Sequence, residues 1–204
     1  MTRTLIIMGF FTAITNFFSC SGQTKQESDV MIVTVMEEKK IEPSKDKLLN
    51  RHLTEQIIDR TSDKYLLDEI FDHLYSQCSV ENKREYDIVL SWNKSKQAVY
   101  KVCLLKGEVN NGGYNQFYNN SGVQYYKDLP DALKLIGAHK FADLTKRAND
   151  TFEKEYERVT KYQEKFLDDP LAGFDNQFFN LSKTKSLEKL LVNYIRKHKT
   201  EFID

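Results

Sequence analysis

The sequence predicts an all-α domain, and three observations carry this prediction. Neither Gly nor Pro occurs from Asp46 to Lys106, from Ala138 to Asp169 or from Phe174 to Asp204. A β-sandwich needs turn residues about every 8–12 residues, so sheet architectures are disfavoured. Apolar residues inside these stretches recur at helical spacing. The hydrophobic content of 40% and the aromatic content of 12% are sufficient for a packed core, which excludes a globally disordered chain.

Three apolar stripes precede the glycine-rich part of the chain. Each stripe repeats at intervals of three or four residues, the spacing of one helix face. In chain order they comprise Leu49, Leu53 and Ile57; Leu67, Ile70, Phe71, Leu74, Tyr75 and Cys78; and Ala98, Val102, Leu105 and Val109. We therefore expect three helices up to residues 110–113.

A glycine-rich segment interrupts the helical pattern, since five of the eight glycines lie between Gly107 and Gly137. Residues 110–113 read Asn-Asn-Gly-Gly and are expected to end a helix, because Asn and Gly tolerate the left-handed conformation. Tyr114, Phe117 and Tyr118 then predict a short helix with an aromatic face, and the core is the expected place for such a face.

Three further helices are expected after the short aromatic helix. Residues 119–122, Asn-Asn-Ser-Gly, end the short aromatic helix, and Asp128 to Asp131 start the next, with Pro130 in its first turn and carboxylates at its positive end. One long helix is then outlined that ends before Pro170, and a final helix follows. Their stripes comprise Phe141, Leu144, Ala148, Phe152, Val159 and Phe166, and then Leu187, Leu190, Leu191, Tyr194 and Ile195.

The first residues are typical of an export signal rather than of a folded element. Arg3 precedes an apolar stretch from Leu5 to Phe18, which is too short for a comfortable membrane span, and Ser19 is the small residue before Cys20. A Cys in this place resembles a lipoprotein lipobox, which makes Cys20 the expected lipidation site; ordinary secretion, or a periplasmic location, is the alternative. We expect a signal at 1–19, a tether at 20–45 and a helical domain at 46–204.

Two features of this arrangement stay open. The run Val30-Met-Ile-Val-Thr-Val-Met36 inside the tether is apolar and β-branched, so it fits either an edge strand or a sticky tether segment. If Cys20 carries lipid, Cys78 and Cys103 remain as a pair in an oxidising compartment. Two unpaired thiols packed on helix faces are the favoured interpretation, and a disulfide is the alternative.

Charge and motifs exclude several classes of function. The chain has 30 Lys and Arg against 30 Asp and Glu, whereas nucleic-acid binders usually carry a basic excess. Residues 143–169 hold 8 acids and 6 bases, and residues 183–204 hold 3 acids and 6 bases, so neither segment imitates DNA. The four histidines show no metal-ligand spacing, and no zinc-protease, nucleophile-elbow or phosphate-loop motif occurs. We expect no direct nucleic-acid binding, no metal and no cofactor.

The glycine-rich segment also carries a family signature. Residues 107–122 read Gly-Glu-Val-Asn-Asn-Gly-Gly-Tyr-Asn-Gln-Phe-Tyr-Asn-Asn-Ser-Gly and resemble the signature of the bacterial DNA-mimic-protein-like family, a domain of unknown function. The pattern continues with an Ile-Gly-Ala turn at 136–138, an Asp-x-x-Phe element at 175–178 and a closing amphipathic helix from Leu187 to His198. The similarity spans about residues 84–202 with several motifs in the same order. It implies an all-helical fold.

The resemblance also suggests what the domain binds. The named member of the family is a homodimer whose acidic surface imitates duplex DNA and occupies a transcription factor, and the resemblance implies a similar role. The neutral charge and predicted export of this chain favour a different role. Our leading hypothesis is a non-enzymatic module that is anchored by lipid at the cell envelope, binds an unidentified protein partner and self-associates. A DNA mimic that regulates a DNA-binding protein is the alternative for a cytosolic chain.

One group of signature residues is the candidate site. Its polar members, with two aromatic residues as a floor, fit a ligand pocket; a buried hydrogen-bonded network that fixes two helix ends is the favoured interpretation. A hydrolase or small-ligand binder using Glu108, Asn111 and Gln116 is the second alternative function. The candidate residues are Glu108, Asn110, Asn111, Gly112, Gly113, Tyr114, Gln116 and Phe117.

Overall fold

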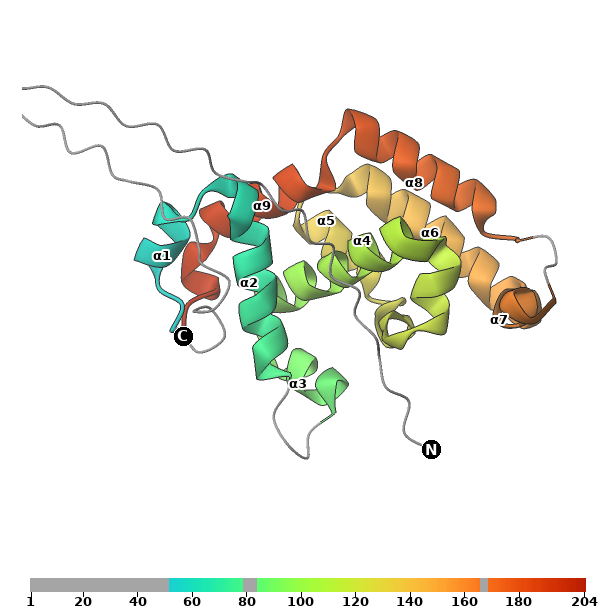
Figure 1. The fold of residues 1–204 in the computed structure, drawn as a ribbon, viewed down its shortest axis with the longest axis horizontal. Coiled ribbons are helices and arrows are strands. Elements are labelled where there is room, and N and C mark those ends of the chain that lie inside the picture. Colours follow the sequence, from blue (N-terminus) through green and yellow to red (C-terminus); the bar gives the residue numbers. More distant parts are fainter. Residues whose placement is uncertain (1–51, 79–83, 166–168) are drawn as a thin grey trace, which may run out of the picture. The chain divides into compact units, whose positions relative to one another are not determined.

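The computed structural model describes residues 52–78, 84–165 and 169–204. These residues form nine α-helices, two short 3-10 helices and no strand, which confirms the all-α prediction (Figure 1). The α-helices are α1 Glu55–Arg60, α2 Asp63–Gln77, α3 Glu85–Ser91, α4 Lys94–Asn119, α5 Leu129–Leu135, α6 His139–Lys154, α7 Tyr156–Lys165, α8 Ala172–Thr184 and α9 Leu187–Lys197. The 3-10 helices are η1 Ser121–Tyr125 and η2 Lys199–Glu201. The expected signal, the tether, Cys20 and Val30–Met36 lie outside the described residues.

Helix α4 is the element around which the others pack. Helices α2, α3, α5, α7 and α8 all contact it (Figure 1). Its predicted stripe is buried, with Val102, Leu105 and Val109 fully inaccessible to solvent. Burial of each such apolar side chain stabilises the fold by roughly 1.5–3 kcal/mol.

Side-chain caps place several helix starts. The Thr54 hydroxyl accepts a hydrogen bond from the Ile57 amide at 3.3 Å, so the first helix begins at Glu55. The first predicted helix is therefore shorter than its stripe, because Leu53 precedes the cap. Asn93 caps α4 by accepting from the Lys96 amide at 2.9 Å. Each such cap is worth about 1 kcal/mol.

The prediction of one long helix from Phe141 to Phe166 is wrong. The chain turns at Glu155 (φ −107°, ψ 25°), which separates α6 from α7. The turn lets Val159 become fully buried where α7 packs against α4. The sequence has no Gly or Pro at this turn, and its apolar residues keep their helical spacing across it. One continuous helix was therefore predicted. Helices α3 and α8, in which only Val89 and only Phe178 are buried, were not predicted.

The remaining helical predictions are confirmed. Helices α2, α5 and α9 have the expected places, and the Gly137 turn, with φ +80°, separates α5 from α6. His139 lies exposed at the first position of α6, and His198 caps the C-terminal end of α9. Among the residues that the structure describes, no helix is long and apolar enough to cross a membrane.

Candidate functional site

The signature segment forms a kink inside α4. Gly112 (φ −155°, ψ 24°) and Gly113 (φ 76°, ψ −176°) leave the helical conformation, and residues 114–119 then continue as a helix. The conformation of Gly113 belongs to a region that is essentially restricted to glycine. The predicted helix end at residues 110–113 is therefore confirmed as a break between two helical segments.

Asp175 from α8 stabilises the second segment of α4. The Tyr114 amide donates a hydrogen bond to Asp175 Oδ1 at 2.7 Å, which satisfies one of the free N–H groups at a helix start. A Cβ atom on Gly113 would collide with this carboxylate, since it would lie 2.7 Å from Asp175 Cγ. Gly113 is thus required both for its backbone angle and for the close approach of Asp175.

The environment of Asp175 changes its acidity. Burial raises the pKa of this carboxyl, Asp169 raises it further, and the hydrogen bond from Tyr114 acts in the opposite direction. The last residue of the Asp-x-x-Phe element is also in place, since Phe178 is buried and packs edge-on against Tyr114 with ring centroids 6.0 Å apart. The two signature segments therefore meet at the kink.

A polar cluster bridges the kink along one side of α4. Gln116 Nε2 and Asn120 Nδ2 both donate to Glu108 Oε2, at 2.6 and 2.8 Å. Asn111 Nδ2 donates to Gln116 Oε1 at 3.0 Å. Glu108 and Asn111 precede the glycines, whereas Gln116 and Asn120 follow them. We call these four residues the kink cluster; its hydrogen bonds connect the two helical segments. Asn111 and Asn120 are exposed and Glu108 and Gln116 are half-buried, so the expectation that this network is buried is wrong.

The other candidate residues do not join this cluster. Asn110 is exposed and lines a small cavity of about 160 Å³ between α2 and α4. Tyr114 and Phe117 are fully buried, which confirms the prediction that the aromatic face belongs to the core. The Tyr114 hydroxyl lies 2.9 Å from Thr145 Oγ1 in α6, and burial raises the pKa of Tyr114. Gly112 leaves room for the Gln116 side chain, because a Cβ there would meet it.

Asn115 is a polar residue in the signature that was not singled out from the sequence. Its side chain is 3% exposed, and neither Oδ1 nor Nδ2 has a hydrogen-bond partner among the described residues. A buried amide without partners costs about 1–3 kcal/mol. The Asn115 amide is therefore expected to lower the stability of the folded domain.

The cysteines and other metal-binding side chains form no centre in the described part of the chain. Cys78 and Cys103 are unpaired and half-buried, in agreement with the favoured interpretation. Burial raises the pKa of the Cys103 thiol to about 12, so this thiol is protonated at neutral pH. No group of three His, Cys, Asp or Glu side chains capable of holding a metal occurs among the residues that were placed.

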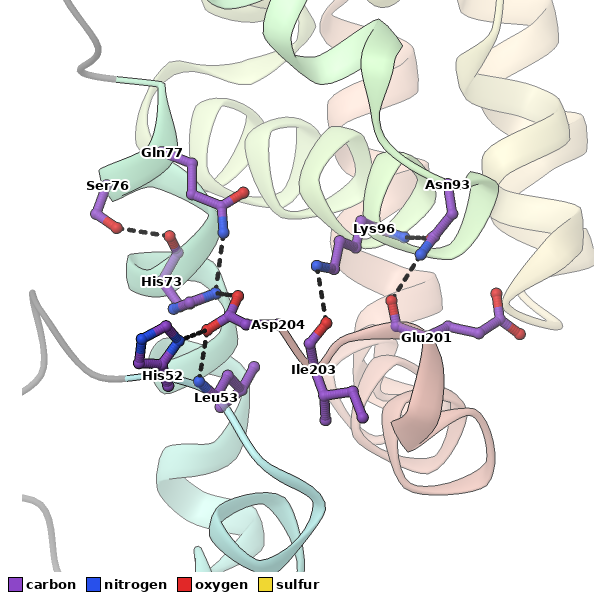
Figure 2. A network of polar contacts seen from close by, with 10 residues as sticks. All are labelled: His52, Leu53, His73, Ser76, Gln77, Asn93, Lys96, Glu201, Ile203 and Asp204. Carbon is purple, nitrogen blue, oxygen red and sulfur yellow. Dashed lines mark hydrogen bonds and ion pairs between the residues drawn. The ribbon is translucent and has the colours of Figure 1, made fainter.

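A second polar network joins the chain end to the start of the domain (Figure 2). The Leu53 amide donates to Asp204 Oδ2 at 2.8 Å, and His73 Nε2 lies 3.0 Å from Asp204 Oδ1. His52 Nδ1 is 3.5 Å from the same carboxylate. We call these four residues the terminal network. Burial works to raise the pKa of Asp204, but the Leu53 amide and His73 outweigh it, so this pKa lies below its usual value.

The same chain end is also attached to the start of α4 (Figure 2). Asn93 Nδ2 donates to the Glu201 carbonyl at 2.7 Å, and Lys96 Nζ donates to the Ile203 carbonyl at 3.3 Å. Sequence reasoning missed these contacts. His73 and Asp204 are 131 residues apart, and no local spacing pattern connects them.

The fold and the kink cluster define a class: an all-helical domain whose polar signature is a helix break closed by its own amides and by an acid from α8. A family model described as DMP19-like protein matches residues 90–198, more than half of the chain, so this protein belongs to the DMP19-like family. The resemblance inferred from the signature is thus confirmed. No curated protein and no solved structure matches the chain. The matched region contains the kink cluster and Asp175, whereas His73 and Asp204 lie outside it.

Proposed function

We propose that this chain is a non-enzymatic module that binds a protein partner through its surface. The proposal rests on the observation that the signature side chains form hydrogen bonds within the protein. Glu108 accepts hydrogen bonds from Gln116 and Asn120, and Asp175 accepts one from the Tyr114 amide. These groups hold the helix break together and have their hydrogen bonds within the protein. Membership of a family named for DNA-mimic proteins supports a protein as the partner.

The charge of the matched region argues against DNA mimicry as the mode of binding. Residues 90–198 contain 18 Lys and Arg against 13 Asp and Glu. Surface acids are also matched by bases, as in the pairs of Asp150 with Lys146 and Glu188 with Lys106. A surface that replaces duplex DNA must present dense, unneutralised negative charge. We therefore propose a partner that is recognised by apolar and mixed-charge contacts.

The exposed apolar residues are the proposed anchors of this interaction. Tyrosine is enriched at the energetically important positions of interfaces, because it buries a large rigid surface. Tyr75 and Tyr156 are 51% and 57% exposed. The other large exposed apolar residues in the described part of the chain are Leu90, Leu135 and Phe179.

Photo-crosslinking tests the partner proposal. A benzophenone amino acid placed at Tyr75 or Tyr156 in cells is expected to give a discrete protein adduct, and the same group at exposed Lys185 is the control. In a second experiment the complex is purified from lysed cells without irradiation, and duplex DNA is added to it before it is irradiated. The yield of the adduct is expected to stay unchanged. Loss of the adduct with duplex DNA would instead establish DNA mimicry. Identical patterns at all three positions would contradict a defined interface.

We further propose that a lipid on Cys20 holds the module at the cell envelope. The support is the order of charged start, apolar stretch and small residue before Cys20. Labelled palmitate is expected to be incorporated into the wild-type chain and not into Cys20→Ala. Release of the unlabelled Cys20→Ala chain from the membrane fraction would accompany this loss, whereas equal labelling of both chains would contradict the proposal.

A further inference from the structure

A cavity of about 570 Å³ lies between α4 and α5, away from the kink cluster. It is lined by one face of each helix, at positions 94, 97, 98 and 101 of α4 and 128, 131, 132 and 135 of α5 and its cap. Ala98 and Ala132 both line it. These short side chains leave the space between two packed helices unfilled. The volume lies within the range of about 300–1,000 Å³ that is usual for small-molecule sites.

The floor of the cavity holds a buried cation. Lys101 is 4% exposed, and its Nζ donates to Gln97 Oε1 and to Asp128 Oδ2, both at 3.2 Å. Gln97 is fixed in orientation, because its Nε2 donates to the Leu90 and Trp92 carbonyls at 3.3 and 2.8 Å. An ammonium has three N–H donors, so these two acceptors leave one further donor on Lys101, whose Nζ also lies 5.5 Å from the centroid of the Tyr125 ring.

One cation of the cavity lining is left without an ion pair. The lining holds two lysines, Lys94 and Lys101, and two acids, Asp128 and Asp131. Asp128, whose side chain is 59% exposed, pairs with Lys101, and Asp131 pairs with Lys134 at 3.1 Å, a lysine that does not line the cavity. Lys94 has no ion pair among the described residues, so it is the cation of the lining that is available to an anion.

The rim of the cavity is apolar. Leu90 and Leu135 are 41% and 47% exposed and both line it. They are two of the five large apolar side chains that the described part of the chain exposes. An apolar rim over a cationic floor complements a molecule with one apolar end and one anionic end.

We propose that this cavity binds a small organic carboxylate with an apolar body. The carboxylate accepts hydrogen bonds from Lys101 and Lys94, and the apolar body packs between Leu90, Leu135 and the two alanines. Hydrogen bonds between ionised partners are about twice as strong as neutral ones, so the carboxylate supplies the selectivity. The site shares Leu90 and Leu135 with the apolar residues proposed above as protein anchors, but it uses neither the tyrosines nor the kink cluster, and its test requires no protein partner.

The test uses the full-length ¹⁵N-labelled chain and sodium octanoate as the probe, with octanamide as the neutral probe of the same length. Octanoate is expected to shift the amide signals of Ala98 and Ala132 saturably. Octanamide is expected to bind about tenfold more weakly, which corresponds to 1.4 kcal/mol. Equal binding of the two probes, or no saturable shift at these alanines, overturns the proposal.

Matched variants separate this site from non-specific binding. Leu135→Asn and Lys94→Gln change exposed residues at the cavity, whereas Phe179→Asn and Lys154→Gln replace another exposed apolar residue and another exposed lysine elsewhere on the surface. The first pair is expected to weaken octanoate binding several-fold and the second pair to leave it unchanged. Lys101→Met is expected to remove the preference for octanoate over octanamide. Equal effects of the cavity variants and the control variants on octanoate binding overturn the proposal. If Lys101→Met fails to fold, Leu135→Asn and Lys94→Gln still test the proposal, because they change exposed residues.

Discussion

The kink cluster and the terminal network are both hydrogen-bonded polar networks, but they connect residues at very different separations along the chain. The kink cluster connects side chains at most twelve positions apart on one helix, as in the bond from Asn120 to Glu108. The terminal network connects Leu53 to Asp204, 151 positions apart. The first preserves a local break in a buried helix, and the second holds the two ends of the described domain together. Local networks leave a readable motif in the sequence, whereas long-range ones do not.

The sharpest test of the kink is Gly113→Ala. Alanine is strained at this backbone conformation, and its Cβ collides with Asp175, so we expect a loss of about 3 kcal/mol in the free energy of unfolding. Gly107→Ala is the matched control, because Gly107 is helical and a Cβ there meets nothing within 4 Å. The control is expected to gain about 0.5–1 kcal/mol. Urea unfolding measures both, and equal effects would mean that the kink does not require glycine.

The cap at the kink is tested by Asp175→Ala and Asp175→Asn. The alanine variant leaves the Tyr114 amide without its acceptor and is expected to lose about 1–2 kcal/mol. Asparagine keeps an oxygen acceptor and is expected to recover most of that loss. If asparagine were as destabilising as alanine, the carboxylate charge rather than the hydrogen bond would be the stabilising element.

Asp175 also predicts the direction of a pH effect. Its pKa is raised in the folded protein, so the folded state binds its proton more tightly than the unfolded state does. The contribution of Asp175 to stability therefore decreases as pH rises from its ordinary value of 3.8 through its folded pKa. Subtracting the Asp175→Asn pH profile from the wild-type profile isolates this decrease. A difference that increases with pH would mean that folding lowers the pKa of Asp175 instead of raising it.

The sequence carried enough information for most helices and for the place of the kink. The stripe of Val102, Leu105 and Val109 predicts its helix because burial of one face selects a spacing of three or four residues. The Asn-Gly content of residues 110–113 marks the break because few other residues accept such backbone angles. These properties are local, so they do not depend on which tertiary contacts the helices make.

What the sequence left open depends on tertiary contacts. Asp175 lies in the recognised Asp-x-x-Phe element, yet its contact with the Tyr114 amide spans 61 positions. The α6–α7 break at Glu155 has no local marker; it accompanies the burial of Val159 in α7, a helix that contacts α4. His73 sits on a helix whose stripe gives no reason to pair it with Asp204. Asn110 and Phe117 were candidates for one site with Glu108, as a hydrogen-bonded network or as a ligand pocket, but Asn110 is exposed and Phe117 lies in the core.

Asp204→Ala tests the terminal network. It removes the acceptor of the Leu53 amide and the partner of His73, and we expect a loss of about 1 kcal/mol. Hydrogen exchange at Leu53 is expected to accelerate, while exchange at Tyr114 is expected to stay slow, since the two networks share no residue. Simultaneous acceleration at both amides would mean that the networks are coupled.

The pH behaviour of Asp204 is expected to be opposite to that of Asp175. Its pKa is lowered in the folded protein, so its contribution is present above the ordinary value of 3.8 and is lost as pH falls through the folded pKa. Asp204→Asn is expected to flatten the acid limb of the stability profile. The comparison fails if the two Asp→Asn variants change the profile in the same direction.

The smallest expected effect is at Asn115, within the same signature as the kink cluster but outside its hydrogen bonds. Asn115→Leu replaces an amide that has no partner among the described residues by an apolar side chain of similar shape. Because the desolvation cost of the amide is removed, we expect stability to stay within about 1 kcal/mol of wild type or to increase. Asn111→Leu is the contrasting variant, since Asn111 donates to Gln116 in the kink cluster. A larger loss for Asn115→Leu than for Asn111→Leu would show that the buried amide, rather than the visible cluster, is the polar group on which the signature depends.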